Sequence, residues 1–305
     1  AEIDKTVDLI RYYAKLAPEL LDSKTITTQA SLSQVRFAPL GVVLAVMPWN
    51  YPVWQIMRFA VPALCAGNAC LVKPAPSVAQ VTAKLMALVD ETMPLHASYI
   101  EHDLIETAIE HTDAMAFTGS TDTGRYLASL AGKHIKKCVL ELGGSNAFIV
   151  LDDADVEQAA NDVVYSRFLD AGQSCNAAKR LIVTPKIADA VVARVVALSE
   201  QLVMGDPMRP ETTLAPLHTQ VLQQKAHAQV QDALAHGAAA LCGGVLPEGQ
   251  GYFYPATVLD HVNPACRVYS EEVFAPILSV LRAADEADAI RLANDTCFGL
   301  GEAVY

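Results

Sequence analysis

The sequence predicts an α/β protein built on parallel sheets. Short apolar runs alternate along the chain with longer segments whose apolar residues recur at helical spacing. Strands that are apolar throughout are typical of parallel sheets covered on both faces, and their alternation with helices is typical of the α/β class. The 305 residues, 52% of them hydrophobic, predict about two domains with well-packed cores.

The predicted strands in the first two thirds of the chain are apolar runs, at Val42–Met47, Ala69–Val72, Ala114–Thr118, Cys138–Glu141, Ala147–Leu151 and Leu181–Thr184. Helical spacing predicts helices at Tyr51–Cys65, Val78–Glu91, Leu104–His111, Thr121–Ala131, Val156–Phe168 and Lys186–Gln201.

The last third continues the pattern less regularly. A helix at Val221–His236 precedes a strand at Ala238–Cys242, and a turn-rich stretch runs from there to Gly251. Two further strands are predicted at Tyr252–Val258 and Ile277–Leu281, and a helix at Asp285–Asn294. The final residues, 299–305, indicate a turn that enters a strand.

Charge and the length of the apolar runs exclude several classes of protein. The chain has 22 Lys and Arg against 34 Asp and Glu, a net charge of -12. It therefore lacks an electrostatic basis for binding nucleic acid or an anionic membrane. No apolar run reaches the roughly 18 residues of a membrane helix, and the charged start Ala1–Lys5 predicts no signal peptide.

The cysteine pattern argues against a disulfide framework and against a structural metal site. The seven cysteines are odd in number and include no CxxC pair. We therefore expect no metal, a reducing cytoplasmic location, and a single cysteine as a candidate nucleophile.

That candidate is Cys175, in the segment Gly172-Gln173-Ser174-Cys175. It follows a predicted helix and precedes a predicted strand, and Gly172 would let the backbone approach a ligand closely. The Cys175 backbone N–H would then be available to an oxyanion. The alternative is a buried structural cysteine, which is a common role of free cysteines.

Two further polar residues lie where predicted strands end. Glu141 ends an apolar strand before a glycine pair, at the edge where open α/β sheets bind ligands, and is a candidate general base. Asn50 follows another strand, where its amide could face a developing oxyanion. The alternatives are an ordinary ion pair for Glu141 and a turn role for Asn50.

A possible phosphate-binding turn lies in Phe117–Gly124. A Gly-Ser-Thr turn that opens a helix after a strand can hold a phosphate on its unpaired N–H groups. The segment is not the G-x-G-x-x-G fingerprint, and an N-cap without any ligand is the alternative.

Together and in this order, these motifs resemble the aldehyde dehydrogenase superfamily. The resemblance covers nearly the whole chain from about Phe37 onward. It rests on Pro48-Trp49-Asn50, Lys73-Pro74, Phe117-Thr118-Gly119-Ser120, Leu140–Gly144, Gly172–Cys175 and Glu271–Phe274. The runs Trp54–Arg58 and Lys137–Ser145 are most similar to the bacterial succinate-semialdehyde dehydrogenase branch.

The resemblance implies NAD(P)-dependent oxidation of an aldehyde to an acid, with Cys175 as nucleophile, Glu141 as general base and Asn50 in the oxyanion hole. It also implies a Rossmann-type NAD(P)-binding domain at residues 1–141 and a catalytic domain at residues 142–305. The residues it assigns to NAD or NADP are Trp49, Lys73, Gly119, Ser120, Gly124, Glu272 and Phe274. Pro76 stands where NAD-preferring members often have a Glu, which leaves NADP permitted.

The implied substrate is an aldehyde with a distal carboxylate, succinate semialdehyde. Arg58 matches the arginine that binds this carboxylate, and Arg167 lies near the position of a second one. The alternative for Arg58 is a surface or interface salt bridge. The alternatives are a neutral aldehyde, a CoA-acylating reaction, against which Glu141 argues, and an inert cofactor-binding fragment.

The chain also departs from the family pattern. Family members are longer at both ends, and the stretch Thr92–Asp103 lacks the usual Gly-Pro turn, which puts one strand of the cofactor sheet in doubt. The resemblance implies a homo-oligomer, a dimer or a tetramer.

Overall fold

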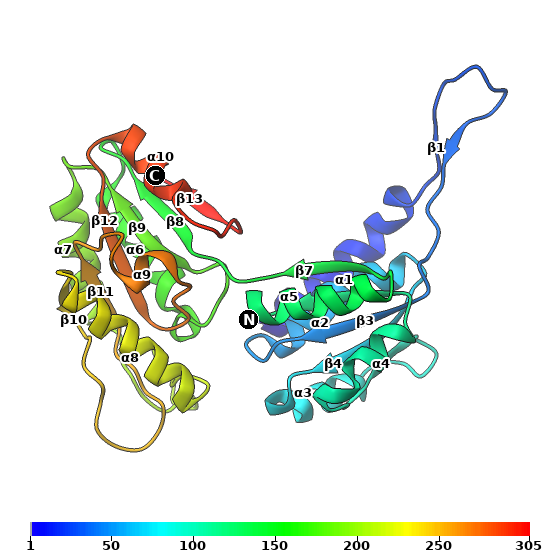
Figure 1. Cartoon of the computed structure of the whole chain (residues 1–305), viewed down its shortest axis with the longest axis horizontal. Coiled ribbons are helices and arrows are strands. Elements are labelled where there is room, and N and C mark those ends of the chain that lie inside the picture. The colour runs from blue at the N-terminus through cyan, green and yellow to red at the C-terminus, as the bar shows by residue number, and fades with distance from the viewer. Residues whose placement is uncertain (1) are drawn as a thin grey trace. The chain divides into compact units, whose positions relative to one another are not determined.

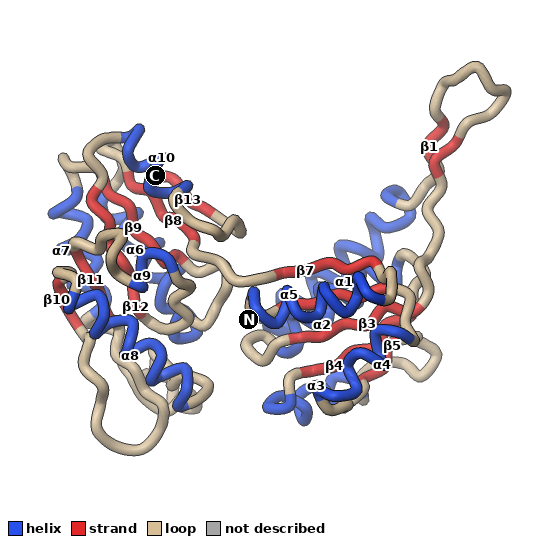
Figure 2. The backbone as a smooth tube through the Cα atoms, in the orientation of Figure 1, coloured by secondary structure: helices blue, strands red, loops and turns tan. Residues whose placement is uncertain are grey.

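The α/β class predicted from the sequence is confirmed. The computed structural model describes residues 2–305, which divide into two compact units, one ending at Leu142 and one comprising Gly143–Tyr305. Each unit has its own sheet (Figure 1 and Figure 2). The assignment of a cofactor-binding role to the first part of the chain and of a catalytic role to the second stays a prediction.

The first unit contains a five-stranded sheet in which every pairing is parallel. In spatial order its strands are β5 (Leu95–Ala97), β4 (Ala69–Pro74), β3 (Val42–Met47), β6 (Ala114–Thr118) and β7 (Lys137–Glu141). The doubt about a strand within Thr92–Asp103 was wrong, because β5 forms there. Leu95, only 3% exposed, pairs with Cys70 of β4, so burial of this side chain holds a strand of three residues in the sheet.

Helices cover both faces of this sheet. On one face α2 (Pro52–Cys65) and α3 (Ala79–Met86) pack against Val43, Ala45 and Met47 of β3. On the other face α4 (Ile105–Glu110) and α5 (Thr121–Lys133) pack against Leu44 of the same strand. The alternation along β3 follows from the period of two in a strand, and it explains why the run is apolar throughout.

Several elements of the first unit lie outside this core. Helix α1 (Glu2–Leu20), which the apolar spacing did not predict, packs against α2 but buries only two of its residues, Thr6 and Ala17. A hairpin of β1 (Lys24–Thr25) and β2 (Gln34–Val35) extends away from the sheet (Figure 1). Short 3-10 turns η1 (Pro76–Val78) and η2 (His102–Leu104) precede α3 and α4.

The second unit contains a six-stranded sheet, parallel except for β10. In spatial order its strands are β10 (Ala239–Cys242), β11 (Thr257–Asp260), β12 (Ile277–Arg282), β9 (Ala178–Val183), β8 (Asn146–Val150) and β13 (Glu302–Val304). The prediction of a strand from Tyr252 was partly wrong, since β11 begins only at Thr257. Pro255 lacks the N–H that a strand in this position would donate.

The helices of the second unit lie on both faces of its sheet. Helices α6 (Val156–Phe168) and α7 (Ala188–Ser199) pack against each other and contact β9 to β12. On the opposite face lie α8 (Gln220–Ala235), α9 (Arg267–Ser270) and α10 (Glu286–Asn294) (Figure 1). A single buried apolar cluster joins the sheet to these helices. Among the described residues, no helix combines the length and the apolar character that spanning a membrane requires.

Candidate active site

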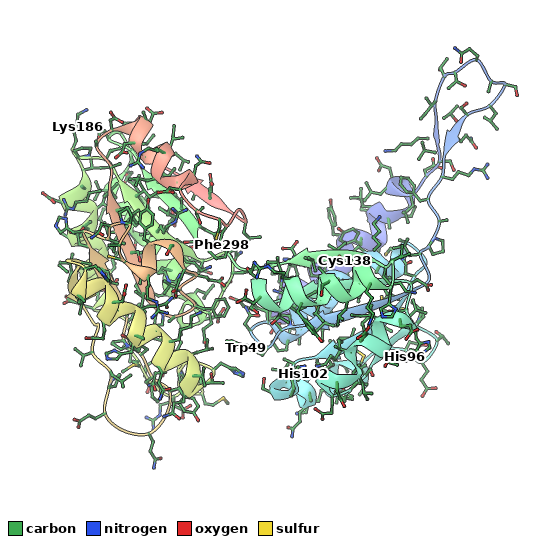
Figure 3. The ribbon with its side chains drawn as sticks, viewed as in Figure 1. Trp49, His96, His102, Cys138, Lys186 and Phe298 are labelled. Atoms are coloured by element: carbon green, nitrogen blue, oxygen red, sulfur yellow. The ribbon has the colours of Figure 1, made fainter. Side chains whose placement is uncertain are left out.

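The carboxyl ends of the strands in the first unit collect most of the predicted cofactor residues of that unit. Trp49 and Asn50 follow β3, and Gly119 and Ser120 follow its neighbour β6; Figure 3 shows Trp49 in the loop after β3. Connections from these two strands lead to opposite faces of the sheet, α2 to one and α5 to the other. Such a switch point is where open α/β sheets bind ligands.

The beginning of α5 has the features of an anion site. Ser120 is the N-cap, and its Oγ accepts a hydrogen bond from the backbone N–H of Thr123 at 3.4 Å. Gly124 is buried in the first turn, where a Cβ would collide with the Leu142 side chain. The helix can therefore pack closely on the segment that follows β7, and the N-terminus of such a helix favours an anion.

Lys73 is the penultimate residue of β4, at the same edge of the sheet, and it is only 4% exposed. Its Nζ donates to the Pro74 carbonyl at 3.5 Å. Burial lowers the pKa of Lys73 below its ordinary value, and the negative charge of Glu101 partly opposes this effect. A buried ammonium with one weak protein acceptor is suited to holding polar groups of a ligand.

The predicted base, Glu141, ends β7 and forms an ion pair with the predicted substrate residue, Arg58 of α2. The Arg58 Nη2 lies 3.3 Å from the Glu141 Oε1, and both side chains are about two fifths exposed, at 40% and 39%. The backbone of Glu141 is fixed separately, because its carbonyl accepts from the Gly119 N–H at 3.0 Å. An ion pair was the alternative interpretation of each of these two residues, but the sequence did not indicate that they pair with each other.

The start of α2 is capped by a residue from α1 that sequence reasoning missed. The Glu2 Oε1 accepts from the backbone N–H groups of Val53 at 2.8 Å and Trp54 at 2.6 Å. This carboxylate compensates two unpaired donors and the positive end of the helix dipole. It therefore stabilises the turn that follows Asn50.

In the second unit, Cys175 lies in a loop with an unusual backbone. Asp170, Ala171 and Gly172 of η3 (Leu169–Gly172) have successive φ values of 52°, 55° and 71°. Left-handed conformations are costly for residues other than glycine and mark functional sites when the surroundings enforce them. The loop then enters β9, and Cys175 itself is half-buried.

Arg167 of α6 is one of the groups that enforce this loop. It is fully buried, and its guanidinium donates to the carbonyls of Gly172 at 3.0 Å, Val273 at 3.2 Å and Ala275. Burial lowers the pKa of Arg167. With its donors directed at main-chain carbonyls, Arg167 has the geometry of a structural residue, which favours this role over the predicted second carboxylate clamp.

The Cys175 carbonyl is held from two sides. It accepts from Asn146 Nδ2 at 2.8 Å and from Lys179 Nζ at 2.6 Å. The loop passes so close to Gly144 that a Cβ there would lie 2.7 Å from the Cys175 carbonyl oxygen. Gly144, the second glycine of the pair that follows Leu142, is therefore a steric requirement of the Cys175 loop.

Lys179 links this loop to Glu272, the predicted ribose-binding carboxylate. Its Nζ lies 3.5 Å from the Glu272 Oε1, which also accepts from the Gly144 N–H at 3.1 Å. Lys179 is 1% exposed, and burial together with the charge of Arg167 lowers its pKa to about 8. Sequence reasoning missed Lys179, because the predicted strand began at Leu181, whereas β9 begins at Ala178.

The remaining predicted residue of this unit is Phe274, half-buried in the segment between α9 and β12, two residues after Glu272. Within residues 2–305, no cluster of His, Cys, Asp and Glu side chains is suited to holding a metal ion. The surroundings of Cys175 in this unit combine a thiol, the Glu272 carboxylate and the buried cations Lys179 and Arg167.

Comparison with known proteins defines the class to which this fold and site belong. The model of the aldehyde dehydrogenase family matches residues 1–305. The chain therefore belongs to the aldehyde dehydrogenase family.

Its relatives narrow the resemblance to one branch. The chain is 42% identical to a succinate-semialdehyde dehydrogenase (NADP(+)) of Mycolicibacterium paratuberculosis, over 99% of this chain and 66% of that protein. It is 40% identical to a succinate-semialdehyde dehydrogenase (NADP(+)) of Deinococcus radiodurans, over 100% of this chain and 65% of that protein. The chain thus spans about two thirds of the length of these relatives.

Solved structures agree with this comparison. A succinic semialdehyde dehydrogenase from Streptococcus pyogenes, in complex with NADP+, has a TM-score of 0.95 and 35% identity. The match covers 100% of this chain and 68% of that one. A lactaldehyde dehydrogenase has a TM-score of 0.94 and 31% identity, covering 100% of this chain and 66% of that one.

Proposed function

We propose that the protein oxidises an aldehyde to a carboxylic acid with NAD or NADP, through a covalent intermediate on Cys175. The observation that carries this proposal is the Cys175 loop, whose left-handed turn is enforced by Arg167 and whose carbonyl is bonded to the buried Lys179. A cysteine beside a cation, in a backbone held at a cost, has the properties of an activated nucleophile.

The chemistry follows from the named side chains. The Cys175 thiolate attacks the aldehyde carbon, and the oxygen of the resulting thiohemiacetal is stabilised by the Asn50 amide and the Cys175 N–H. The nicotinamide cofactor, when bound, would supply the acceptor for the hydride whose loss oxidises this adduct to a thioester. Glu141 takes a proton from water, the water oxygen attacks the thioester carbon, and the Cys175 thiolate leaves as the acid forms.

The cofactor fits the edge of the first sheet. The N-terminus of α5 with Ser120 and Gly124 suits a phosphate, and Lys73 suits ribose hydroxyls. The family resemblance assigns further cofactor contacts to Trp49, Gly119, Glu272 and Phe274. Pro76 offers no carboxylate that would repel a 2′-phosphate, and the relatives named for NADP support that cofactor.

The proposed substrate is succinate semialdehyde, with Arg58 binding its distal carboxylate. The identities of 40% and 42% to succinate-semialdehyde dehydrogenases support this substrate. A neutral aldehyde is the second candidate, because the Arg58 guanidinium already has a carboxylate partner in Glu141, and the likeness to a lactaldehyde dehydrogenase points the same way.

Assembly and location complete the proposal. We expect a homo-oligomer, a dimer or a tetramer, as the family resemblance implies. The cysteines are free thiols, which supports a reducing cytoplasmic location.

The test is the formation of NADH and NADPH by the purified protein with succinate semialdehyde and with butanal, which has the same number of carbons and no carboxylate. Efficient turnover that favours the semialdehyde and is lost in Cys175→Ser is the expected result. Equal efficiency with both aldehydes would support the neutral-aldehyde alternative, and no reduced cofactor with either would overturn the proposal.

A further inference from the structure

We propose that Arg58 holds the general base Glu141 at rest and releases it when the distal carboxylate of the substrate takes its place. The carboxylate of the substrate would thereby switch on the hydrolysis of its own thioester. This inference rests on the proposed function and adds to it a coupling between substrate recognition and deacylation.

Two predicted roles meet on the Arg58 guanidinium. Arg58 Nη2 is 3.3 Å from the Glu141 Oε1, so the group assigned to the substrate carboxylate is already paired with the group assigned to water activation. A carboxylate bound to Arg58 would bring a second negative charge against Glu141. Repulsion between these carboxylates favours the departure of the Glu141 side chain.

The ion pair between Arg58 and Glu141 is weak enough for another carboxylate to replace Glu141. It is a single contact between side chains that are 40% and 39% exposed, and such pairs contribute little stability. By contrast, Arg267 and Glu271 form two hydrogen bonds at 2.8 and 3.1 Å. The Glu141 carboxylate can therefore separate from Arg58 at a small cost in free energy.

The Glu141 side chain can move while its backbone stays in β7. Its backbone pairs in register with Thr118 of β6, and its carbonyl accepts from the Gly119 N–H at 3.0 Å. The displacement is therefore confined to the side chain. The substrate carboxylate acts as the trigger, and the fold around the site stays as it is.

The consequence is a difference between two acyl groups on Cys175. A succinyl group carries the carboxylate that displaces Glu141, whereas a butyryl group of the same length leaves Glu141 paired with Arg58. We expect the succinyl thioester to hydrolyse about twofold to fivefold faster, the range that corresponds to the strength of a half-exposed ion pair.

The experiment measures deacylation directly and needs no cofactor. The full-length purified protein is acylated with mono-p-nitrophenyl succinate or with p-nitrophenyl butyrate, excess ester is removed, and loss of the acyl group from Cys175 is followed by intact-protein mass spectrometry. Arg58→Gln should raise the rate for the butyryl protein about twofold to fivefold and abolish the advantage of the succinyl protein. Arg58→Lys, which keeps the charge, should retain part of that advantage.

A matched control is Arg194→Gln, which removes an arginine of similar exposure on α7 that pairs with Glu157 of α6 at 2.8 Å. It should leave both rates unchanged. Wild-type rates that are equal for the two acyl groups, or a slower butyryl rate in Arg58→Gln, would overturn the inference. The wild-type comparison decides the question even where a variant fails to fold.

The outcomes also separate this inference from the proposed function. Absence of acylation at Cys175, together with no oxidation of either aldehyde, counts against the function itself. Acylation followed by hydrolysis that ignores the distal carboxylate counts only against the coupling of Arg58 to Glu141.

Discussion

Replacement of Lys179 by methionine tests the electrostatics of the Cys175 loop. The Lys179 side chain is 1% exposed and 3.5 Å from the Glu272 carboxylate, yet burial and the charge of Arg167 lower its pKa from 10.5 to about 8. Since one pKa unit corresponds to 1.36 kcal/mol, keeping this ammonium protonated in the folded protein costs about 3 kcal/mol.

The sign of the pH dependence follows from proton binding. Below pH 8 the folded and unfolded chains both hold the Lys179 proton, and the full cost is present. Between about pH 8 and 10.5 the unfolded chain holds more protons than the folded one, so stability rises with pH. Lys179→Met removes this contribution.

The assay is denaturant unfolding of the wild type and of Lys179→Met, at a series of pH values from 7 to 10. The free energy of unfolding of the wild type should rise relative to the variant by up to about 1.4 kcal/mol per pH unit above pH 8. Parallel curves for the two proteins across this range would refute the reasoning, because they would mean that the Lys179 proton is held equally in both states.

Three further substitutions test the packing around the site. Glu2→Ala removes the acceptor of two N–H groups of α2 and should cost about 1 kcal/mol of unfolding free energy; an unchanged value would show that water caps the helix equally well. Gly144→Ala places a Cβ 2.7 Å from the Cys175 carbonyl oxygen and should lower the free energy of unfolding by about 1–3 kcal/mol. The control Gly132→Ala, whose Cβ meets no atom within 4 Å, should instead stabilise α5 by about 0.5–1 kcal/mol. Equal effects of the two substitutions in thermal unfolding would contradict the steric argument. Arg167→Met leaves main-chain carbonyls buried without a donor and should cost about 3 kcal/mol or more; a variant of normal stability whose only defect is a raised KM for succinate semialdehyde would instead restore Arg167 as a substrate residue.

The central strands could be predicted where burial on two faces makes them continuous apolar runs, as in β3 and β6. The predicted Val42–Met47 and Ala114–Thr118 agree with β3 and β6 residue for residue. Elements that escaped prediction carry weaker signals, as α1 and β5 show. Helix α1 buries only Thr6 and Ala17, and β5 has three residues, so neither leaves a distinct apolar pattern in the sequence.

The candidate site was predictable as a set of residues but not as a set of contacts. Motif order predicts roles for Asn50, Glu141 and Cys175, because each lies beside a strand end or a glycine turn, and these roles stay predictions. The partners of such residues come from distant positions, as when Glu2 caps a helix 51 residues further along. No local pattern reveals that Arg58 pairs with Glu141 or that Lys179 holds the Cys175 carbonyl.

The most direct test of the central claim is to stop the reaction at its covalent stage. The Glu141→Gln variant is incubated with succinate semialdehyde and NADP+. It should form one equivalent of NADPH and carry a succinyl group on Cys175, which intact-protein and peptide mass spectrometry would detect. That result would establish Cys175 as nucleophile and Glu141 as the base of hydrolysis in one experiment. Continued turnover by Glu141→Gln, or NADPH formed with no acyl group on Cys175, would contradict the account.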